Sequence, residues 1–265
     1  WNGAGDGRFK VMMGPHAPYT CPPDYIRKVR DVAEKYDMPI HIHLSETKGE
    51  VENCEKEYHM TPIALMDSLG LFERPTLAAH CVHVTDDDIR IMKEKHVCAA
   101  HNPASNLKLA SGIAPVPKMR KAGITVGIGT DGASSNNKLD MFAEMRLTAL
   151  IHKAANYDPF AITAKEAVDM ATKDGAKCLG YDNLGELKEG FLADIILVDR
   201  TGFHWKPRFD SVSLAVYAGN SMDVDTVIIN GRPVMEHKEL LTIDTEKMDA
   251  EVKRVTEKLY AFTNK

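Results

Sequence analysis

Short apolar runs alternate with amphipathic segments in the first half of the chain. The runs have the length and composition of β-strands, and the segments between them carry apolar residues at helical spacing. In segment 24–36, for example, Ile26, Val29 and Val32 follow Pro22-Pro23, where a helix readily begins. The pattern predicts strands at 9–13, 39–44, 76–81, 97–100 and 125–128, and helices at 24–36, 50–59, 61–69, 86–95 and 116–122.

Such strand–helix alternation is typical of parallel strands joined by crossover helices. Polar groups recur just after the strand ends: His16, His43 with Glu46, His80 with His83, His101, and Asp131. In a (β/α) barrel the carboxyl ends of the strands carry the active site. We therefore expect these side chains to meet at one edge of the sheet.

The pattern changes in the second half of the chain. Helices are expected at 139–155 and 163–179, followed by strands at 193–199, 225–230 and 231–235 and an amphipathic closing helix at 244–262. Asn230-Gly231 between two apolar runs is a hairpin signal. We predict a catalytic partial barrel over 1–180, and a small β element with the closing helix over 181–265.

Composition narrows the class of protein. The 265 residues are 44% hydrophobic and 27% charged, and a net charge of −5 argues against nucleic acid or an anionic membrane as the main partner. No run approaches the roughly 20 apolar residues that a membrane helix requires. The five cysteines form no CxxC pair, which favours reduced thiols and a cytoplasmic protein.

The segment His41-Ile-His43-Leu-Ser-Glu46 suggests metal chemistry. Alternate strand residues share a face, so both imidazoles project to one side, and Glu46 falls in the turn beyond. Neutral imidazole is the commonest metal ligand, and a nearby carboxylate can transfer protons. The alternatives are a hydrogen-bonded strand histidine at 43, a solvated loop glutamate at 46 and a turn aspartate at 131.

Five motifs together resemble the amidohydrolase superfamily, and within it the 5′-methylthioadenosine/S-adenosylhomocysteine deaminases, relatives of the chlorohydrolases. The match runs from about residue 7 to about 242. The motifs are Gly14-Pro-His-Ala-Pro-Tyr-Thr-Cys21, His41-Ile-His-Leu-Ser-Glu-Thr47, Ala79-His-Cys-Val-His83, His101-Asn-Pro-Ala-Ser-Asn-Leu-Lys108 and Gly129-Thr-Asp-Gly132. The resemblance implies a (β/α)8 TIM barrel of the metal-dependent hydrolase type, with a small β domain.

The resemblance also implies an activity: hydrolytic deamination of S-adenosylhomocysteine or 5′-methylthioadenosine to the inosine analogue and ammonia. One divalent metal, Zn²⁺ with Fe²⁺ or Ni²⁺ as alternatives, would be held by His43 and Asp131. Glu46 would contact the substrate and protonate its ring, and Asp131 would manage the proton of the attacking water. His80 would orient that water, although it could itself be a ligand, and His16 would contact the substrate.

The sequence predicts less specific roles for the remaining histidines. His41 is expected behind the ligands or in the core, and His83 and His101 as packing or loop-anchoring groups. Asn106 and Lys108 are expected to shape the mouth of the site. Surface positions are expected for His59, His96, His152, His204 and His237.

The chain also departs from the family pattern. The early His-x-His pair of metal ligands is absent, and the five predicted strands correspond to the fourth to eighth of eight. With Trp1 as first residue, we expect an N-terminally truncated chain that binds metal weakly and exposes strand edges. Its expected partners are a second copy or the missing N-terminal half. Two alternatives are a sibling hydrolase acting on guanine, cytosine or s-triazines, and a non-catalytic assembly module.

Overall fold

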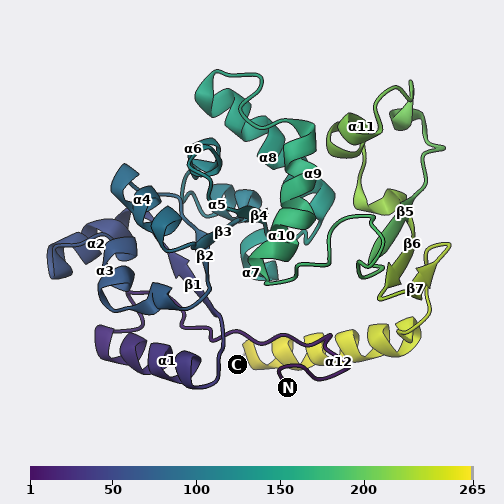
Figure 1. Cartoon of the computed structure of the whole chain (residues 1–265). Coiled ribbons are helices and arrows are strands. Elements are labelled where there is room, and N and C mark those ends of the chain that lie inside the picture. The colour runs from purple at the N-terminus through teal and green to yellow at the C-terminus, as the bar shows by residue number, and fades with distance from the viewer. Residues whose placement is uncertain (264–265) are drawn as a thin grey trace.

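Four parallel strands form the first sheet of the computed structural model, which describes residues 1–263. They are β1 (Ile40–Leu44), β2 (Thr76–His80), β3 (Cys98–His101) and β4 (Val126–Ile128). Each pairs in parallel with the next along the chain, in the order β1-β2-β3-β4 (Figure 1). The predicted parallel alternation is therefore confirmed, and all four strands point their carboxyl ends to one edge.

The predicted strand at 9–13 is wrong. Only Met13 pairs, as a single parallel bridge to Ile40. Its amide donates to the Pro39 carbonyl at 2.8 Å, and its own carbonyl accepts from the His41 amide at 2.9 Å. Phe9 is 48% exposed, so only the last residue of the apolar run reaches the sheet. An apolar run becomes a strand only where a neighbour satisfies its backbone along its length.

Helices connect these strands, and the five predicted ones are confirmed to within a few residues. Thr85 caps its helix reciprocally with Asp88, and Gly123 has a φ of +86° at the end of another. Short helices at 103–108 and 133–136 were not expected from periodicity. The helices are α1 (Pro23–Lys35), α2 (Lys48–Tyr58), α3 (Pro62–Ser68), α4 (Asp86–Glu94), α5 (Pro103–Lys108), α6 (Val116–Lys121) and α7 (Ala133–Asn136), with a 3₁₀ turn, η1 (Leu71–Glu73).

Three further helices follow: α8 (Met141–Asn156), α9 (Ala164–Ala171) and α10 (Lys173–Cys178). The single helix predicted over 163–179 is broken at Thr172, whose φ and ψ of −121° and −97° are not helical. Because of this break, α9 and α10 both pack against β4. Buried side chains of β4 and α9 belong to one hydrophobic core.

A second, antiparallel sheet contains β5 (Ile195–Val198), β6 (Val224–Ile229), β7 (Arg232–Glu236) and β8 (Glu239–Leu240). Asn230 and Gly231 both have positive φ, as the predicted hairpin turn requires. Helix α11 (Ser211–Tyr217) packs on α8 and α9 and places Val216 in the common core. Two 3₁₀ turns, η2 (Phe203–Trp205) and η3 (Ser221–Asp223), flank it. The division at residue 180 remains a prediction.

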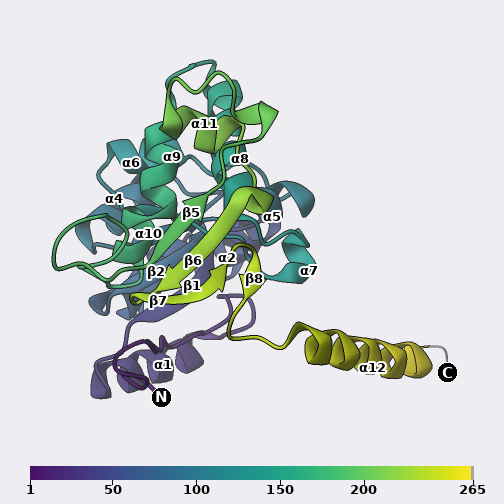
Figure 2. The ribbon, with the colours of Figure 1, turned by 90° about the vertical axis from the view of Figure 1, so that its right-hand side faces the viewer.

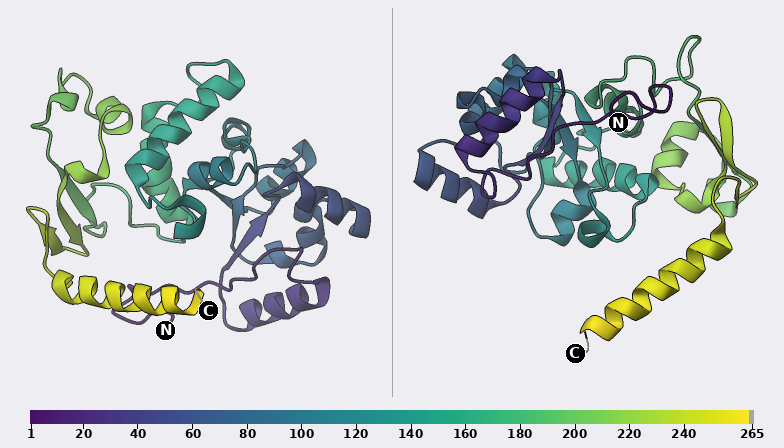
Figure 3. Two further views of the ribbon diagram at one scale, coloured as in Figure 1. Left: turned by 180° about the vertical axis from the view of Figure 1, so that it is seen from behind. Right: turned by 90° about the horizontal axis from the view of Figure 1, so that it is seen from below.

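The closing helix α12 (Thr245–Thr263) is confirmed, but it contributes no buried residue. It overlaps the N-terminal segment in the projection of Figure 1, but Figure 2 and the right panel of Figure 3 show it extending away from both sheets. Val252 and Leu259 are each 59% exposed. Among residues 1–263, no helix is long and apolar enough to cross a membrane.

Candidate active site

His43, near the end of β1, is fixed by the backbone of the preceding loop. Its amide and its Nδ1–H both donate to the carbonyl oxygen of His16, at 3.1 and 2.6 Å. In the neutral ring, the lone pair of Nε2 is therefore free to accept a hydrogen bond or to bind a metal ion. The ring lies 5.0 Å from that of His16 and stacks on that of His80 at 5.4 Å, measured between centroids.

A buried carboxylate shapes the turn that carries Glu46. Oε1 of Glu50 accepts from the Ser45 amide at 2.9 Å, and Oε2 accepts from the Glu46 amide at 2.8 Å. These bonds hold Ser45 at a φ of +53°. Burial raises the pKa of Glu50, and the backbone donors oppose that rise. No motif marks Glu50 as functional. The sequence does show a helix cap here, with a threonine at 47 three residues before Glu50, and the Glu50 amide donates to the Thr47 hydroxyl.

The Glu46 side chain is 15% exposed and faces His80. Oε2 lies 3.7 Å from His80 Nε2, too far for a direct hydrogen bond. Oε1 accepts from the Ser111 hydroxyl at 3.3 Å. A solvated loop position is thereby excluded, and one carboxylate oxygen stays available to a ligand.

His80 ends β2 with a φ of +72° and is buried. Its Nδ1–H donates to Oδ1 of Asn106 at 2.7 Å, which directs Nε2 towards Glu46. Asn106 is also buried, on α5. Asn106 thus fixes the orientation of the His80 ring, and its expected role in shaping the mouth of the site remains a prediction.

Asp131 follows β4 with a φ of +58°. Oδ2 accepts from the Ser105 hydroxyl and Oδ1 from the Gly132 amide, both at 2.6 Å. Burial by itself would raise the Asp131 pKa, but these bonds and the nearby His80 lower it overall. The carboxylate is thus held ionised at neutral pH.

The two expected metal ligands, His43 and Asp131, both line a cavity of about 550 Å³. His41 lines the same cavity, and the small residues Ala99 and Gly127 form part of its wall. The His41 pKa is lowered by burial and by the neighbouring imidazoles of His43 and His80. His41 therefore belongs to the cavity wall rather than to the core.

His16 lies beside His43, but its side chain is exposed. Its Nδ1 is 2.7 Å from the Thr20 hydroxyl, and its ring meets Tyr19 edge-on with centroids 5.6 Å apart. The structure thus brings His16, His43, Glu46 and His80 into one row. The predicted substrate contact of His16 remains a prediction.

His43 and Asp131 have the chemistry of metal ligands, but they supply only part of a metal site. A metal-binding imidazole commonly donates its other N–H to a carbonyl, as His43 does to His16, and Asp131 is held ionised. Across residues 1–263, however, no group of three or more His, Cys, Asp or Glu side chains is arranged to hold a metal ion. Catalytic zinc uses three protein ligands, so these two donors constitute an incomplete set.

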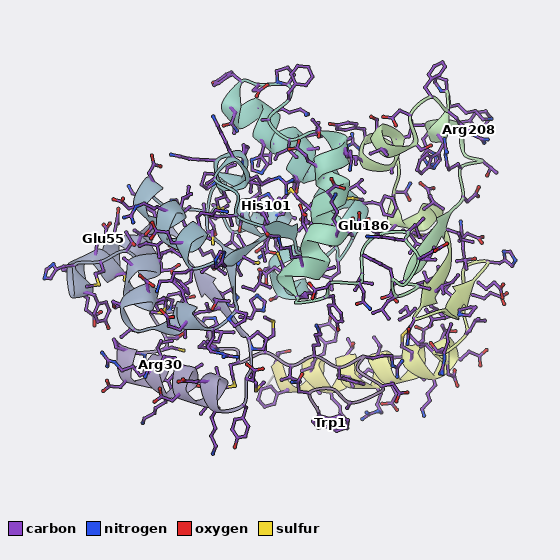
Figure 4. All side chains as sticks on the ribbon, in the orientation of Figure 1. Trp1, Arg30, Glu55, His101, Glu186 and Arg208 are labelled. Atoms are coloured by element: carbon purple, nitrogen blue, oxygen red, sulfur yellow. The ribbon has the colours of Figure 1, made fainter. Side chains whose placement is uncertain are left out.

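The prediction that His152 lies on the surface is wrong. His152, on α8, is 1% exposed, and its Nε2 lies 3.2 Å from Nε2 of His101. Figure 4 shows His101 in the interior, between the strands and the long helices. Burial lowers the pKa of His152 to about 4 and that of His101 well below its usual value. His101 is thereby confirmed as a packing residue.

The other peripheral residues follow expectation. His83 Nε2 lies 2.7 Å from the Ser111 carbonyl oxygen, so it anchors the loop that carries the Glu46 contact. Lys108 donates to the Ser134 carbonyl at 2.8 Å, beside the Asp131 loop. Of the histidines expected at the surface, His59, His96, His204 and His237 are exposed.

Residues 1–234 match the profile of the Amidohydrolase family. The chain is 55% identical over 254 residues to a 5-methylthioadenosine/S-adenosylhomocysteine deaminase of Dictyoglomus thermophilum, covering 96% of this chain and 60% of that protein. The chain therefore spans about three fifths of the length of such relatives.

Two solved structures have the same fold. A zinc-bound adenosine deaminase from Xanthomonas campestris superposes with a TM-score of 0.94 at 35% identity, covering 98% of this chain and 60% of that one. A zinc complex of atrazine chlorohydrolase from Arthrobacter aurescens TC1 gives a TM-score of 0.88 at 29% identity, with coverages of 94% and 55%.

Proposed function

The chain belongs to the amidohydrolase family, and from this premise we propose that the intact protein hydrolytically deaminates adenine nucleosides. The proposed substrates are S-adenosylhomocysteine and 5′-methylthioadenosine, and the products are the inosine analogue and ammonia. The observation that carries the proposal is Glu46 beside His80, at the strand edge where Asp131 is held ionised.

The proposed roles follow from these positions. Glu46 contacts the purine and delivers a proton to the ring nitrogen beside the amino-bearing carbon. Its Oε2 is the available atom, because Oε1 already accepts from Ser111. His80 accepts through Nε2 and orients the attacking water, since Asn106 occupies Nδ1. Asp131 takes the proton of that water and passes it to the departing amine.

Zinc is the proposed metal, because the Xanthomonas campestris relative was crystallised with it. A bound divalent cation lowers the pKa of a coordinated water towards neutrality. His43 Nε2 and the Asp131 carboxylate are the proposed ligands in this chain. The five cysteines are free thiols, so a reducing, cytoplasmic location is part of the proposal.

The test is ammonia release from S-adenosylhomocysteine by the intact protein, with the inosine product identified by mass spectrometry. We expect ammonia in proportion to product, and loss of both in Glu46→Gln. Turnover of guanine, cytosine or a chlorinated triazine in place of the nucleosides would assign the site to a sibling activity. No turnover of any of these by a zinc-loaded protein would contradict the hydrolase assignment.

A further inference from the structure

Two cysteines far apart in the sequence line one cavity, and Cys178 also lines the cavity that His43 and Asp131 line. Cys98 is the first residue of β3, whereas His101 is its last, and Cys178 ends α10. Helix α10 packs on β3, and Cys98 and Cys178 both line the cavity between them. Cys178 Sγ also lies 3.9 Å from the carbonyl oxygens of Ala99 and Thr125, which fixes it against the strands.

Both thiols line one cavity of about 420 Å³, so small molecules can reach them. Cys98 is partly exposed, and Lys177 lines the same cavity. The other cysteines, Cys21, Cys54 and Cys81, are at most 7% exposed. Burial raises the pKa of Cys54 to about 11 and raises that of Cys81 further. Cys54 and Cys81 therefore stay protonated, and all three buried cysteines provide internal controls.

The two paired thiols differ in reactivity. The neighbouring Cys178 thiol lowers the Cys98 pKa, against the effect of burial, and the Lys177 charge lowers it further. The neighbouring Cys98, together with burial, raises the pKa of Cys178. Only the thiolate is the nucleophile, so Cys98 is the thiol that attacks. An accessible thiol of low pKa beside a second cysteine is the usual arrangement of a redox-sensitive site.

We propose that Cys98 and Cys178 form a pair that reacts with hydrogen peroxide and closes to a disulfide between β3 and α10. The Cys98 thiolate attacks one oxygen of the peroxide, the O–O bond breaks, and the departing hydroxide takes a proton to leave as water. The Cys178 sulfur then loses its proton and attacks the Cys98 sulfenic acid, and a second water leaves as the S–O bond breaks. The pair is oxidised by two electrons and the peroxide is reduced to two waters.

The experiment treats the intact protein with hydrogen peroxide, blocks the remaining thiols, and maps the linked peptides by mass spectrometry without reduction. We expect Cys98 linked to Cys178, no linkage of Cys21, Cys54 or Cys81, and reversal of the linkage by dithiothreitol. Free Cys98 after treatment would overturn the proposal. So would its conversion to sulfinic acid, or a linkage to a different cysteine.

Single substitutions separate the two roles. Cys178→Ser should stop the reaction at a Cys98 sulfenic acid that dimedone traps, and Cys98→Ser should leave Cys178 unreactive. Cys54→Ser is the matched control and should form the same linked pair as the wild type. Circular dichroism establishes that each variant is folded. A Cys98→Ser protein that consumes peroxide as fast as the wild type would contradict the assigned roles.

Discussion

Nε2 of His80 lies 3.7 Å from Oε2 of Glu46, although the two residues belong to different strand ends. Glu46 lies in the turn after β1, and His80 ends β2. Because β1 and β2 pair in parallel, Leu44 is in register with His80, and the turn after β1 extends alongside it. The parallel register thus brings a proton donor and an acceptor to one edge of the sheet.

Replacing Glu46 by glutamine tests the proposed proton transfer. We expect kcat to fall about 10²–10⁴-fold, because an amide cannot deliver the proton. Steady-state kinetics with 5′-methylthioadenosine measures the effect. Glu52→Gln on the exposed side of α2 is the control and should keep its activity, since Glu52 pairs only with solvated Lys48. Activity of Glu46→Gln within a few-fold of the wild type would remove Glu46 from the reaction.

Glu50→Gln tests the support of the Glu46 turn. One amide oxygen can still accept, but the new NH₂ group would oppose a backbone N–H of Ser45 or Glu46. We expect the free energy of unfolding to fall by about 1–3 kcal/mol, together with a loss of kcat. Urea denaturation and kinetics provide the two readouts. An unchanged kcat in a destabilised protein would show that Glu50 supports the fold but not Glu46.

The buried pair His101–His152 predicts acid sensitivity. The His152 pKa is about 4 in the folded state, below the 6.5 of an unfolded chain, so folding favours the neutral ring. This contribution is fully present above pH 6.5 and is lost as pH falls towards 4. It amounts to about 3 kcal/mol.

Urea denaturation at several pH values between 7 and 4 measures this loss. His152→Gln should lose less stability over that window than the wild type, because it lacks the group that must become protonated. His59→Gln, on the surface, should follow the wild type. Parallel curves for wild type and His152→Gln would contradict the assigned titration.

Deleting residues 245–263 tests the role of α12. Because the helix has no buried residue, its removal should change Tm by less than about 2 °C. Differential scanning calorimetry of this 265-residue chain and of the shortened chain gives the comparison. A larger fall in Tm would mean that the apolar side chains of α12 are covered in solution.

Local sequence patterns determined most of the secondary structure and much of the candidate site. The caps at Thr85 and Gly123 and the hairpin at Asn230-Gly231 depend on neighbouring residues alone, so they could be predicted. The positions of His43, Glu46, His80 and Asp131 also follow from strand ends, because parallel strands bring those ends to one edge.

Tertiary structure decided the features that depend on contacts between residues far apart in the sequence. Met13 makes one bridge where a strand was predicted, because β1 pairs with it at a single position. His152 is buried because α8 brings it against His101, 51 residues away in the sequence. Cys98 and Cys178 meet because α10 packs on β3. Periodicity reports which face of an element is apolar but not which element covers it, so these contacts could only come from the packed structure.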